Sequence, residues 1–140
     1  MKIALGSDHA GFELKEKIKI IFKEKNIGYN DFGPFSKESV DYPDFGHKVG
    51  NSIQENESDL GIVICGSGNG INMTVNKYSK VRSALSWTKE ICELGRLHNN
   101  ANVLAIPARF ISENLALEIV DVFLNTEFEG GRHERRVNKI

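Results

Sequence analysis

The chain has 140 residues, of which 40% are hydrophobic and 26% are charged, and its formal net charge is −1 at pH 7. These values are ordinary for one globular domain that can bury most of its apolar surface. A net charge near zero argues against non-specific nucleic-acid binding, which needs a strongly basic face. The longest apolar run is far short of a membrane span, and the apolar N-terminal stretch is too short for a signal peptide. We therefore expect residues 1–140 to form a single cytoplasmic domain that does not act on membranes.

Strand-like and helix-like segments alternate along the whole chain. Apolar runs predict strands over residues 2–7, 29–32, 60–64, 81–86 and 102–106. Helical spacing predicts helices over about 11–25, 43–56, 71–77 and 88–98, and from 112 onward. In the first helix Leu14, Ile18 and Phe22 form the inner stripe, and the lysines and glutamates are expected to fill the solvent-facing side. The alternation predicts an α/β fold with a five-stranded parallel sheet covered by helices on both faces.

Polar residues follow four of the five predicted strands. They are Asp8 and His9, Cys65 and Ser67, Ser86 and Trp87, and Arg109. The carboxyl ends of parallel strands meet at one edge of a sheet, where ligands bind in open α/β folds. We therefore expect these side chains to converge on one rim, and we expect His98 and two spaced arginines to join them there.

The stretch Cys65–Gly70 (Cys-Gly-Ser-Gly-Asn-Gly) follows the most strand-like run and precedes a predicted helix. Its glycines would let backbone N–H groups approach an oxyanion or a phosphate, and a helix N-terminus favours a thiolate at Cys65. Ile71 stands where a dinucleotide-binding fingerprint has glycine, and the Gly-Lys-Ser/Thr of a P-loop is absent. A buried structural cysteine beside a tight turn is the simpler interpretation of the same residues. A phosphate- or oxyanion-binding loop with a reactive thiol is the functional one.

Asp8, His9 and His98 each have a structural and a catalytic interpretation. Asp8 is a good helix cap beside a solvated His9, or the pair supplies an acid–base group at the rim. His98 at a helix C-terminus is stabilised by the helix dipole, or it assists proton transfer.

Arg132 and Arg136 lie four residues apart in the polar tail. On a helix they share one face and suit a phosphate group, although a solvated helix pairing with Glu129 and Glu134 explains them as well. Cys92 lies beside the apolar stripe of its helix and is expected to be structural. The spacing of Cys, His and Asp does not predict a metal site, and no nicotinamide or flavin motif occurs.

Five motifs in a fixed order resemble those of the B-type ribose-5-phosphate isomerases. The motifs are Gly6–Phe12 (Gly-Ser-Asp-His-Ala-Gly-Phe), Asp41–Pro43, Cys65–Ile71, Arg96–Leu104 and Glu129–Val137, which together cover essentially the whole chain. The resemblance implies a Rossmann-like three-layer α/β sandwich with a C-terminal helical tail. It also implies homodimers, often paired into tetramers, with active sites between subunits, and a tail over 125–140 that contributes to dimer contacts and to the phosphate site. The implied reaction interconverts ribose 5-phosphate and ribulose 5-phosphate without metal or cofactor.

The resemblance also implies a role for each matching residue. Cys65 would be the base that moves a proton between C1 and C2 through an enediolate. Asp8 and His98 would help to open the furanose ring, and Asn99 would bind the enediolate. Oxyanion stabilisation would come from the Ser67 hydroxyl and the loop amides of Gly66, Ser67, Gly68, Asn69 and Gly70. Substrate binding, mainly through the phosphate, would involve His9, Tyr42, Arg109, Arg132 and Arg136. Ser67 stands where the family commonly has threonine, and because the hydroxyl is retained we expect tuning of the activity rather than its loss.

Two alternatives stay open. A hexose-6-phosphate isomerase acting on allose or galactose phosphates shares the loop, although the pair His98–Asn99 favours the pentose enzyme. A non-catalytic phosphosugar-binding regulator would keep Arg132 and Arg136 but has no need for Cys65 together with His98.

Overall fold

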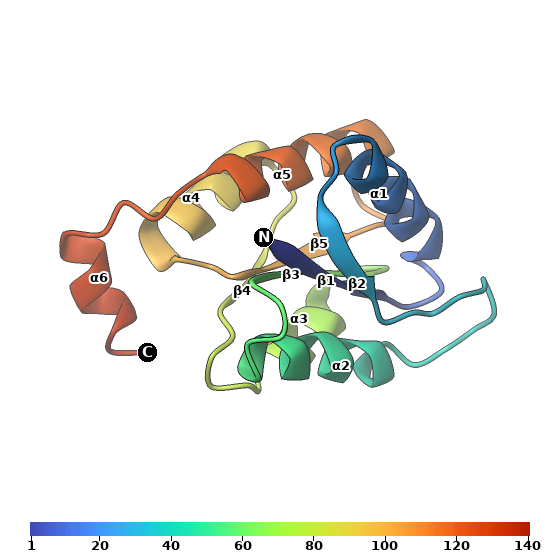
Figure 1. Cartoon of the computed structure of the whole chain (residues 1–140), viewed down its shortest axis with the longest axis horizontal. Helices are drawn as coiled ribbons and strands as arrows, with labels where there is room; N and C mark the ends of the chain where they lie inside the picture. The colour runs from blue at the N-terminus through green and yellow to red at the C-terminus, as the bar shows by residue number, and fades with distance from the viewer.

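A computed structural model describes all 140 residues of the chain. Five strands and six helices follow one another as β1 Lys2–Ser7, α1 Phe12–Glu24, β2 Gly28–Asp31, α2 Tyr42–Gln54, β3 Leu60–Cys65, α3 Asn69–Val75, β4 Ser83–Leu85, α4 Lys89–Asn99, β5 Val103–Pro107, α5 Glu113–Asn125 and α6 Arg132–Val137. The strands form one sheet in the order β2-β1-β3-β5-β4, and every neighbouring pair is parallel. Figure 1 shows the sheet between two helical layers, so the predicted three-layer α/β fold is confirmed.

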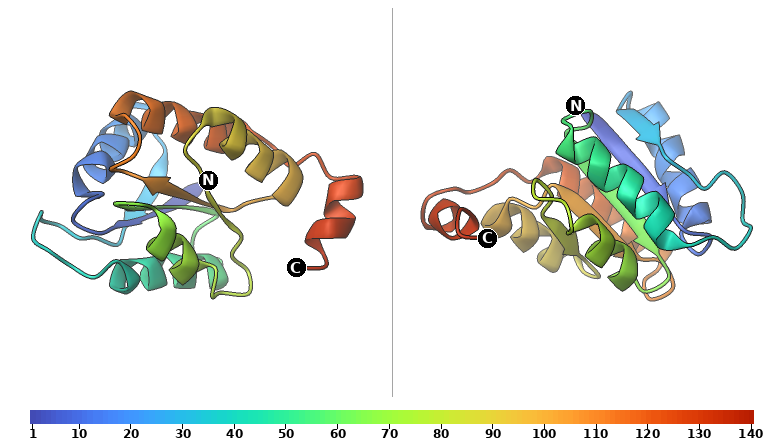
Figure 2. Two further views of the ribbon diagram at one scale, coloured as in Figure 1. Left: turned by 180° about the vertical axis from the view of Figure 1, so that it is seen from behind. Right: turned by 90° about the horizontal axis from the view of Figure 1, so that it is seen from below.

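Each face of the sheet has its own hydrophobic core. On one face α1, α4 and α5 cover side chains such as Leu5, Ile64 and Ile106, all almost fully buried. On the other face α2 and α3 cover Ala4 and Val63, together with other buried side chains that include Cys65. The two layers are seen from behind and from below in Figure 2. Alternate residues of β1 and β3 serve opposite cores, which explains why both strands are apolar almost throughout.

The observed boundaries differ from the expected ones where turn chemistry decides them. The strand expected over 81–86 contains only Ser83–Leu85, and Val81 instead closes a turn, its N–H donating to the Tyr78 carbonyl at 3.0 Å. Helix α3 begins at Asn69 rather than at Ile71, directly after Gly68 in a left-handed conformation (φ 73°). The tail does form the helix α6, which packs against α4 and stands apart from the rest of the molecule (Figure 1).

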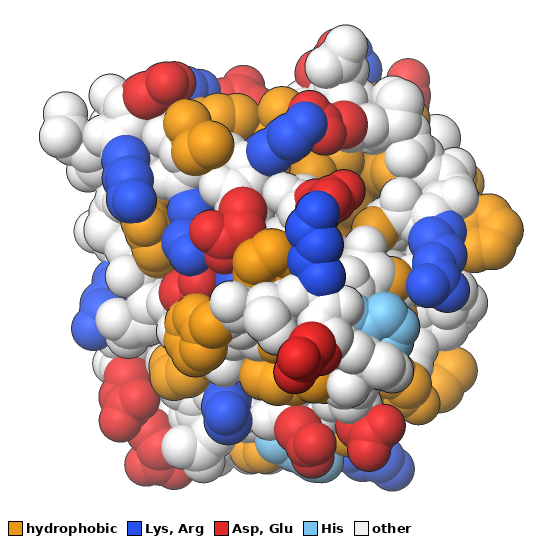
Figure 3. Space-filling model, turned by 90° about the vertical axis from the view of Figure 1, so that its right-hand side faces the viewer, with side chains coloured by type: hydrophobic (Ala, Val, Ile, Leu, Met, Phe, Trp, Pro, Cys, Tyr) orange, Lys and Arg blue, Asp and Glu red, His pale blue; other side chains and the backbone are white.

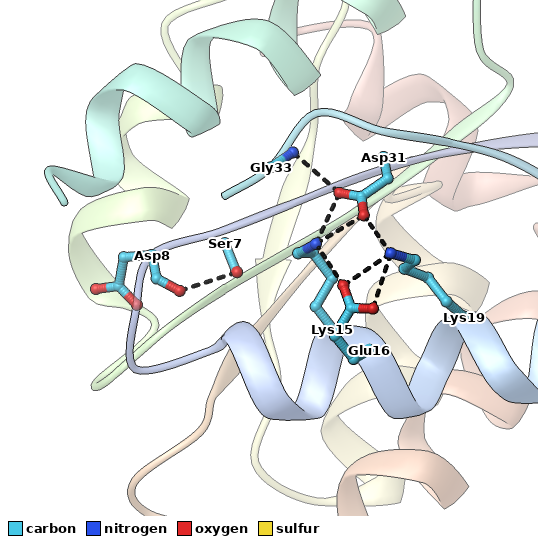
Figure 4. Close-up of polar contacts among 7 residues, drawn as sticks. All are labelled: Ser7, Asp8, Lys15, Glu16, Lys19, Asp31 and Gly33. Atoms are coloured by element: carbon cyan, nitrogen blue, oxygen red, sulfur yellow. Dashed lines mark hydrogen bonds and ion pairs between the residues drawn. The ribbon is translucent and has the colours of Figure 1, made fainter. Parts of the chain in front are cut away.

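Lys15 is a clear exception to the predicted pattern, because it is fully buried although the lysines of α1 were assigned to the solvent-facing side. Its ammonium group lies 2.7 and 2.8 Å from the two carboxylate oxygens of Asp31, at the end of β2. Lys19 also donates to Asp31, at 2.6 Å, and the Gly33 N–H donates to it at 2.9 Å (Figure 4). The carbonyl of Gly33 in turn accepts a hydrogen bond from the Ser7 N–H. The buried ion pair therefore fixes the segment after β2 against the end of β1.

Asp31→Asn is expected to destabilise the protein more than Lys15→Met. The first change leaves the buried Lys15 ammonium without its main partner, which typically costs about 3–5 kcal/mol. The second leaves Asp31 paired with Lys19 and with the Gly33 amide, so its cost should be smaller. Free energies of unfolding from guanidinium titrations measure both. Equal losses, or a larger loss for Lys15→Met, would contradict this account of the network.

The same pair gives the stability an acid dependence. Burial alone raises the pKa of Asp31, but the hydrogen bonds from Lys15 and Lys19 outweigh burial, so this pKa lies below its ordinary value of 3.8. A depressed folded-state pKa stabilises the protein above the ordinary pKa, and this contribution is lost as the pH falls through the folded-state pKa. In Asp31→Asn the free energy of unfolding should therefore fall less steeply as the pH is lowered through this range than it does in the unchanged protein.

Candidate active site

The carboxyl ends of β1, β3 and β5 form one rim, held together by backbone hydrogen bonds. The Asp8 N–H donates to the carbonyl of Ile64 at 3.1 Å, which ties the end of β1 to β3. The Ala108 N–H donates to the carbonyl of Cys65, and the Arg109 N–H to that of Gly66, both at 3.0 Å. These bonds place the residues after three strands within one edge of the sheet, as the sequence predicted.

Cys65 is the last residue of β3, and its side chain is only 4% exposed. It packs in the smaller core with Ile71 and Ala105, so it is anchored on the sheet rather than on a mobile loop. The burial is what a structural cysteine would have, and it also restricts access of bulk water to the thiol.

The loop Gly66–Gly70 turns tightly over the end of β3. Gly68 has a φ of 73°, and a Cβ there would lie 2.5 Å from the Leu85 side chain and 3.1 Å from the backbone of Ile106. A Cβ on Gly70 would lie 2.4 Å from the ring of Tyr42. The exposed Ser67 accepts a hydrogen bond from the Asn69 N–H at 3.3 Å. Side chains at the two glycines would displace this loop, which carries the Ser67 hydroxyl directly after Cys65 in the chain.

Asp8 and His9 lie beside this loop with defined hydrogen bonds. The Asp8 oxygen Oδ1 accepts from the N–H groups of Ala10 (2.9 Å) and Gly11 (3.1 Å), which closes the turn before α1. The N-cap of α1 is Gly11, without a side-chain hydrogen bond, so the expectation that Asp8 caps the helix itself is wrong. Oδ2 has no protein partner and stays available. The His9 nitrogen Nδ1 accepts from the Val40 N–H at 3.2 Å, which leaves its Nε2–H as a donor.

Tyr42 and Arg109 frame the loop from either side. Tyr42 opens α2 and contacts Gly70, and the Arg109 side chain lies against Gly66, 3.2 Å from where a Cβ would be. Ser86 is buried and Trp87 is half-exposed at the end of β4. Figure 3 shows the molecule from the side toward which the strands run, where acidic, basic and hydrophobic side chains are interspersed.

His98 and Asn99 do not reach this rim, so the expectation that all site residues converge on one edge is wrong for a single chain. They end α4, which runs back from the end of β4 to the start of β5. The Arg82 guanidinium donates to the carbonyls of Asn99 and Asn100. This end of α4 therefore lies close to the start of β5 at Val103. Cys65 is paired instead with Pro107, at the opposite end of β5. The helix alone is about 16 Å long, at 1.5 Å for each of its 11 residues.

Arg132 and Arg136 lie on α6, beside α4 and therefore at the same distant edge as His98. Both arginines are exposed, and neither makes an ion pair within the chain. The predicted pairing with Glu129 and Glu134 does not form. Neither guanidinium group is therefore neutralised by a carboxylate of its own chain.

Sequence reasoning missed a group of three side chains around His98. The rings of His98 and His133 are stacked, with centroids 4.1 Å apart and planes 9° from parallel. A carboxylate oxygen of Glu129 lies 3.8 Å from Nε2 of His98 and 3.7 Å from Nε2 of His133. Burial and the neighbouring His98 lower the pKa of His133. The four-residue spacing from Glu129 to His133 was the only signal in the sequence.

A groove of about 860 Å³ lies elsewhere on the chain. It is a mainly apolar groove between α1 and α5, lined by side chains such as Ile18, Phe22 and Leu117. The nucleophilic and acid–base groups described above do not line it, so it is not the candidate active site.

The comparisons with known proteins cover almost the whole chain. A family model described as Ribose/Galactose Isomerase matches residues 3–140. The chain belongs to the ribose/galactose isomerase family.

Individual relatives agree with this assignment. The chain is 43% identical to the probable ribose-5-phosphate isomerase B of Mycoplasma genitalium, over 99% of this chain and 92% of that protein. It is 40% identical to ribose-5-phosphate isomerase B of Escherichia coli, over 99% of this chain and 93% of that protein. The crystal structure of a Thermotoga maritima ribose 5-phosphate isomerase matches with a TM-score of 0.95 and 52% identity, over 99% of this chain and 95% of that one.

One solved structure carries a ligand. It is ribose-5-phosphate isomerase B from Mycoplasma genitalium with bound ribulose-5-phosphate, which matches with a TM-score of 0.95 and 42% identity, over 99% of this chain and 92% of that one. The sugar phosphate is thus seen on a protein with the same fold as this family member.

No helix combines the length and the apolar character that crossing a bilayer requires.

Proposed function

We propose that this family member interconverts D-ribose 5-phosphate and D-ribulose 5-phosphate. The observation that carries the proposal is its likeness, over 99% of the chain, to the Mycoplasma genitalium isomerase with bound ribulose-5-phosphate. The rim of this chain offers the groups that such a reaction requires: a thiol base, a hydroxyl and loop amides for an oxyanion, and cations for a phosphate. The reaction moves protons only and is redox-neutral, so it needs no electron-transfer cofactor.

Cys65 is the base of the proposed reaction. In the open-chain aldose its thiolate removes the proton from C2, and the electron pair of that C–H bond forms the C1–C2 double bond of an enediolate while O1 gains the negative charge. The resulting thiol then returns the proton to C1, and the proton of the O2 hydroxyl moves to O1. The C=O bond is thereby transferred from C1 to C2. Anchoring on β3 holds the sulfur atom in place for both transfers.

Charge on the enediolate oxygen needs preorganised donors. The Ser67 hydroxyl and the amides of Gly66–Gly70 can supply them, because the first N–H groups of a helix such as α3 have no intrahelical acceptor. The tight contacts of Gly68 and Gly70 keep these donors in position before substrate arrives.

Ring opening needs proton transfer at the ring oxygen and the anomeric hydroxyl. We assign these transfers to the free Oδ2 of Asp8 and to His98, with Asn99 contacting the enediolate. His98 and Asn99 lie at the far edge of their own chain, so we infer that they come from a second copy. The active site is then built between two subunits, each supplying one edge of its sheet.

The phosphate is expected to lie between two sets of cations and donors. The Nε2–H of His9, the hydroxyl of Tyr42 and the guanidinium of Arg109 approach it from the rim. Arg132 and Arg136 of the second copy approach it from α6. Their exposure and lack of internal ion pairs support this role, because paired guanidinium groups bind phosphate strongly. We also infer a cytoplasmic location, where the free thiols of Cys65 and Cys92 stay reduced.

The kcat/KM values of the purified protein should be highest for ribose 5-phosphate. Allose 6-phosphate and galactose 6-phosphate carry one more carbon, and a closed site built for a pentose should position their C1 and C2 poorly. A coupled assay on the three sugars measures the order. Preference for either hexose would replace the proposed substrate but leave the enediolate mechanism in place.

Cys65→Ala should lower kcat on ribose 5-phosphate by about 100- to 10,000-fold, the usual contribution of a positioned base. Cys92→Ala is the matched control, because Cys92 is also buried but donates weakly to the Ile119 carbonyl inside the larger core. Burial raises the pKa of Cys92 to about 11, which makes it a poor base at neutral pH. Cys92→Ala should therefore lose stability while keeping kcat. Near-normal turnover in Cys65→Ala would remove Cys65 from the mechanism.

Mixing two inactive variants tests whether the site is shared. In a dimer of Cys65→Ala with His98→Ala, one of the two active sites combines a native Cys65 with a native His98. Random exchange makes half of the dimers mixed, so about a quarter of the native activity should return. Co-refolding at equal amounts, followed by the isomerase assay, measures this. If both groups act within one chain, no mixture regains activity.

A further inference from the structure

Three potential metal ligands meet where α4 ends and α6 begins. They come from His98, Glu129 and His133, and one ligand atom of each lies within 4.8 Å of the other two. The Glu129 carboxylate oxygen lies 3.8 Å from Nε2 of His98 and 3.7 Å from Nε2 of His133. The Glu129 N–H donates to the carbonyl of Leu97 at 3.1 Å, and the His133 N–H donates to that of Gly130 at 3.1 Å. The backbone therefore fixes the three residues next to one another before any ligand arrives.

Nε2 of His133 is buried and has no hydrogen-bond partner in the chain. The residue is only 6% exposed, and the nearest acceptor, the Glu129 carboxylate, is 3.7 Å away, which is too far for a hydrogen bond. A buried polar atom without a partner typically costs about 1–3 kcal/mol. Its position, aimed at a carboxylate and beside a second imidazole, points to a ligand that is shared by all three groups.

The donor set fits a transition metal better than Mg²⁺ or Ca²⁺. Imidazole nitrogen suits Zn²⁺ and its neighbours, whereas Mg²⁺ and Ca²⁺ prefer oxygen-only sets. Two histidines and one glutamate with an open fourth position are a familiar Zn²⁺ arrangement.

The distances also suit a tetrahedral ion. Bonds of about 2.1 Å in a tetrahedron separate the ligand atoms by roughly 3.4 Å. The observed separations of 3.7 and 3.8 Å are slightly larger. The two imidazole rings must tilt away from their parallel stacking, and the half-exposed Glu129 side chain must move inward.

We propose that His98, Glu129 and His133 form a binding site for a divalent transition-metal ion, best matched by Zn²⁺. The ion is coordinated by Nε2 of His98, so this histidine can no longer transfer the proton assigned to it above in ring opening. Bound Zn²⁺ therefore inhibits the isomerase reversibly, and this consequence rests on the proposed function, whereas the binding itself does not.

Binding is measured on the full protein by competition with a chromogenic zinc chelator. The expected result is one Zn²⁺ per chain, with affinity lowered about tenfold or more in Glu129→Gln and in His133→Gln, since even indirect ligand partners contribute 10- to 100-fold. Glu134→Gln, a change at an exposed glutamate on the same helix, should leave the affinity unchanged. Cys65→Ala should also bind normally, which separates this site from capture of zinc by the active-site thiol. Absence of binding, equal binding by Glu129→Gln, or loss of binding in Cys65→Ala would overturn the site.

Inhibition is measured separately with ribose 5-phosphate. The Zn²⁺ concentration for half-inhibition should rise about tenfold or more in Glu129→Gln relative to Glu134→Gln, and excess EDTA should restore activity. If Zn²⁺ binds with no effect on turnover, the inhibitory role is wrong although the site stands. A protein without activity on any of the three sugars would refute the proposed function and leave the binding result intact.

Discussion

The direction of the parallel strands is the constraint on which the rest of this structure depends. When all strands point one way, every crossover helix must run back the other way, so its C-terminus lies at the amino edge of the sheet. Cys65 ends a strand, and His98 ends a helix of this kind. The two residues are therefore placed at opposite edges by topology alone. No adjustment of a loop could bring them together within one chain.

This separation is the physical reason for the proposal that two subunits share the site. If Cys65 and His98 have the roles proposed above, one chain holds two half-sites, and pairing with a second copy completes both at once. The apolar groove between α1 and α5 carries ion pairs such as Lys25 with Asp121 rather than the proposed reacting groups.

Much of the fold and of the rim could be predicted from the sequence. The spacing of hydrophobic residues identifies each helix and strand locally, and the alternation of strands with helices sets the direction of the strands. Asp8, Cys65 and Arg109 were predicted on one edge simply because each follows a strand, and the structure places them there. His98 was misplaced because its position was inferred from its chemistry rather than from the direction of α4. The end of a crossover helix is also predictable, so this part of the error was avoidable.

Lys15 and His133 were beyond prediction for a different reason. Each is a polar residue whose burial depends on one contact distant in sequence: Asp31 neutralises Lys15, and the stacked His98 ring covers His133. The helical spacing of hydrophobic residues alone predicts that both side chains face solvent. The outcomes also differ, because the Lys15 ammonium group is fully paired while Nε2 of His133 is left without a partner. A fold can retain a buried nitrogen without a hydrogen bond where ligand binding offsets the free-energy cost of burying it. Because Glu129 and His98 lie next to this nitrogen, we infer that the ligand is a cation rather than the sugar phosphate.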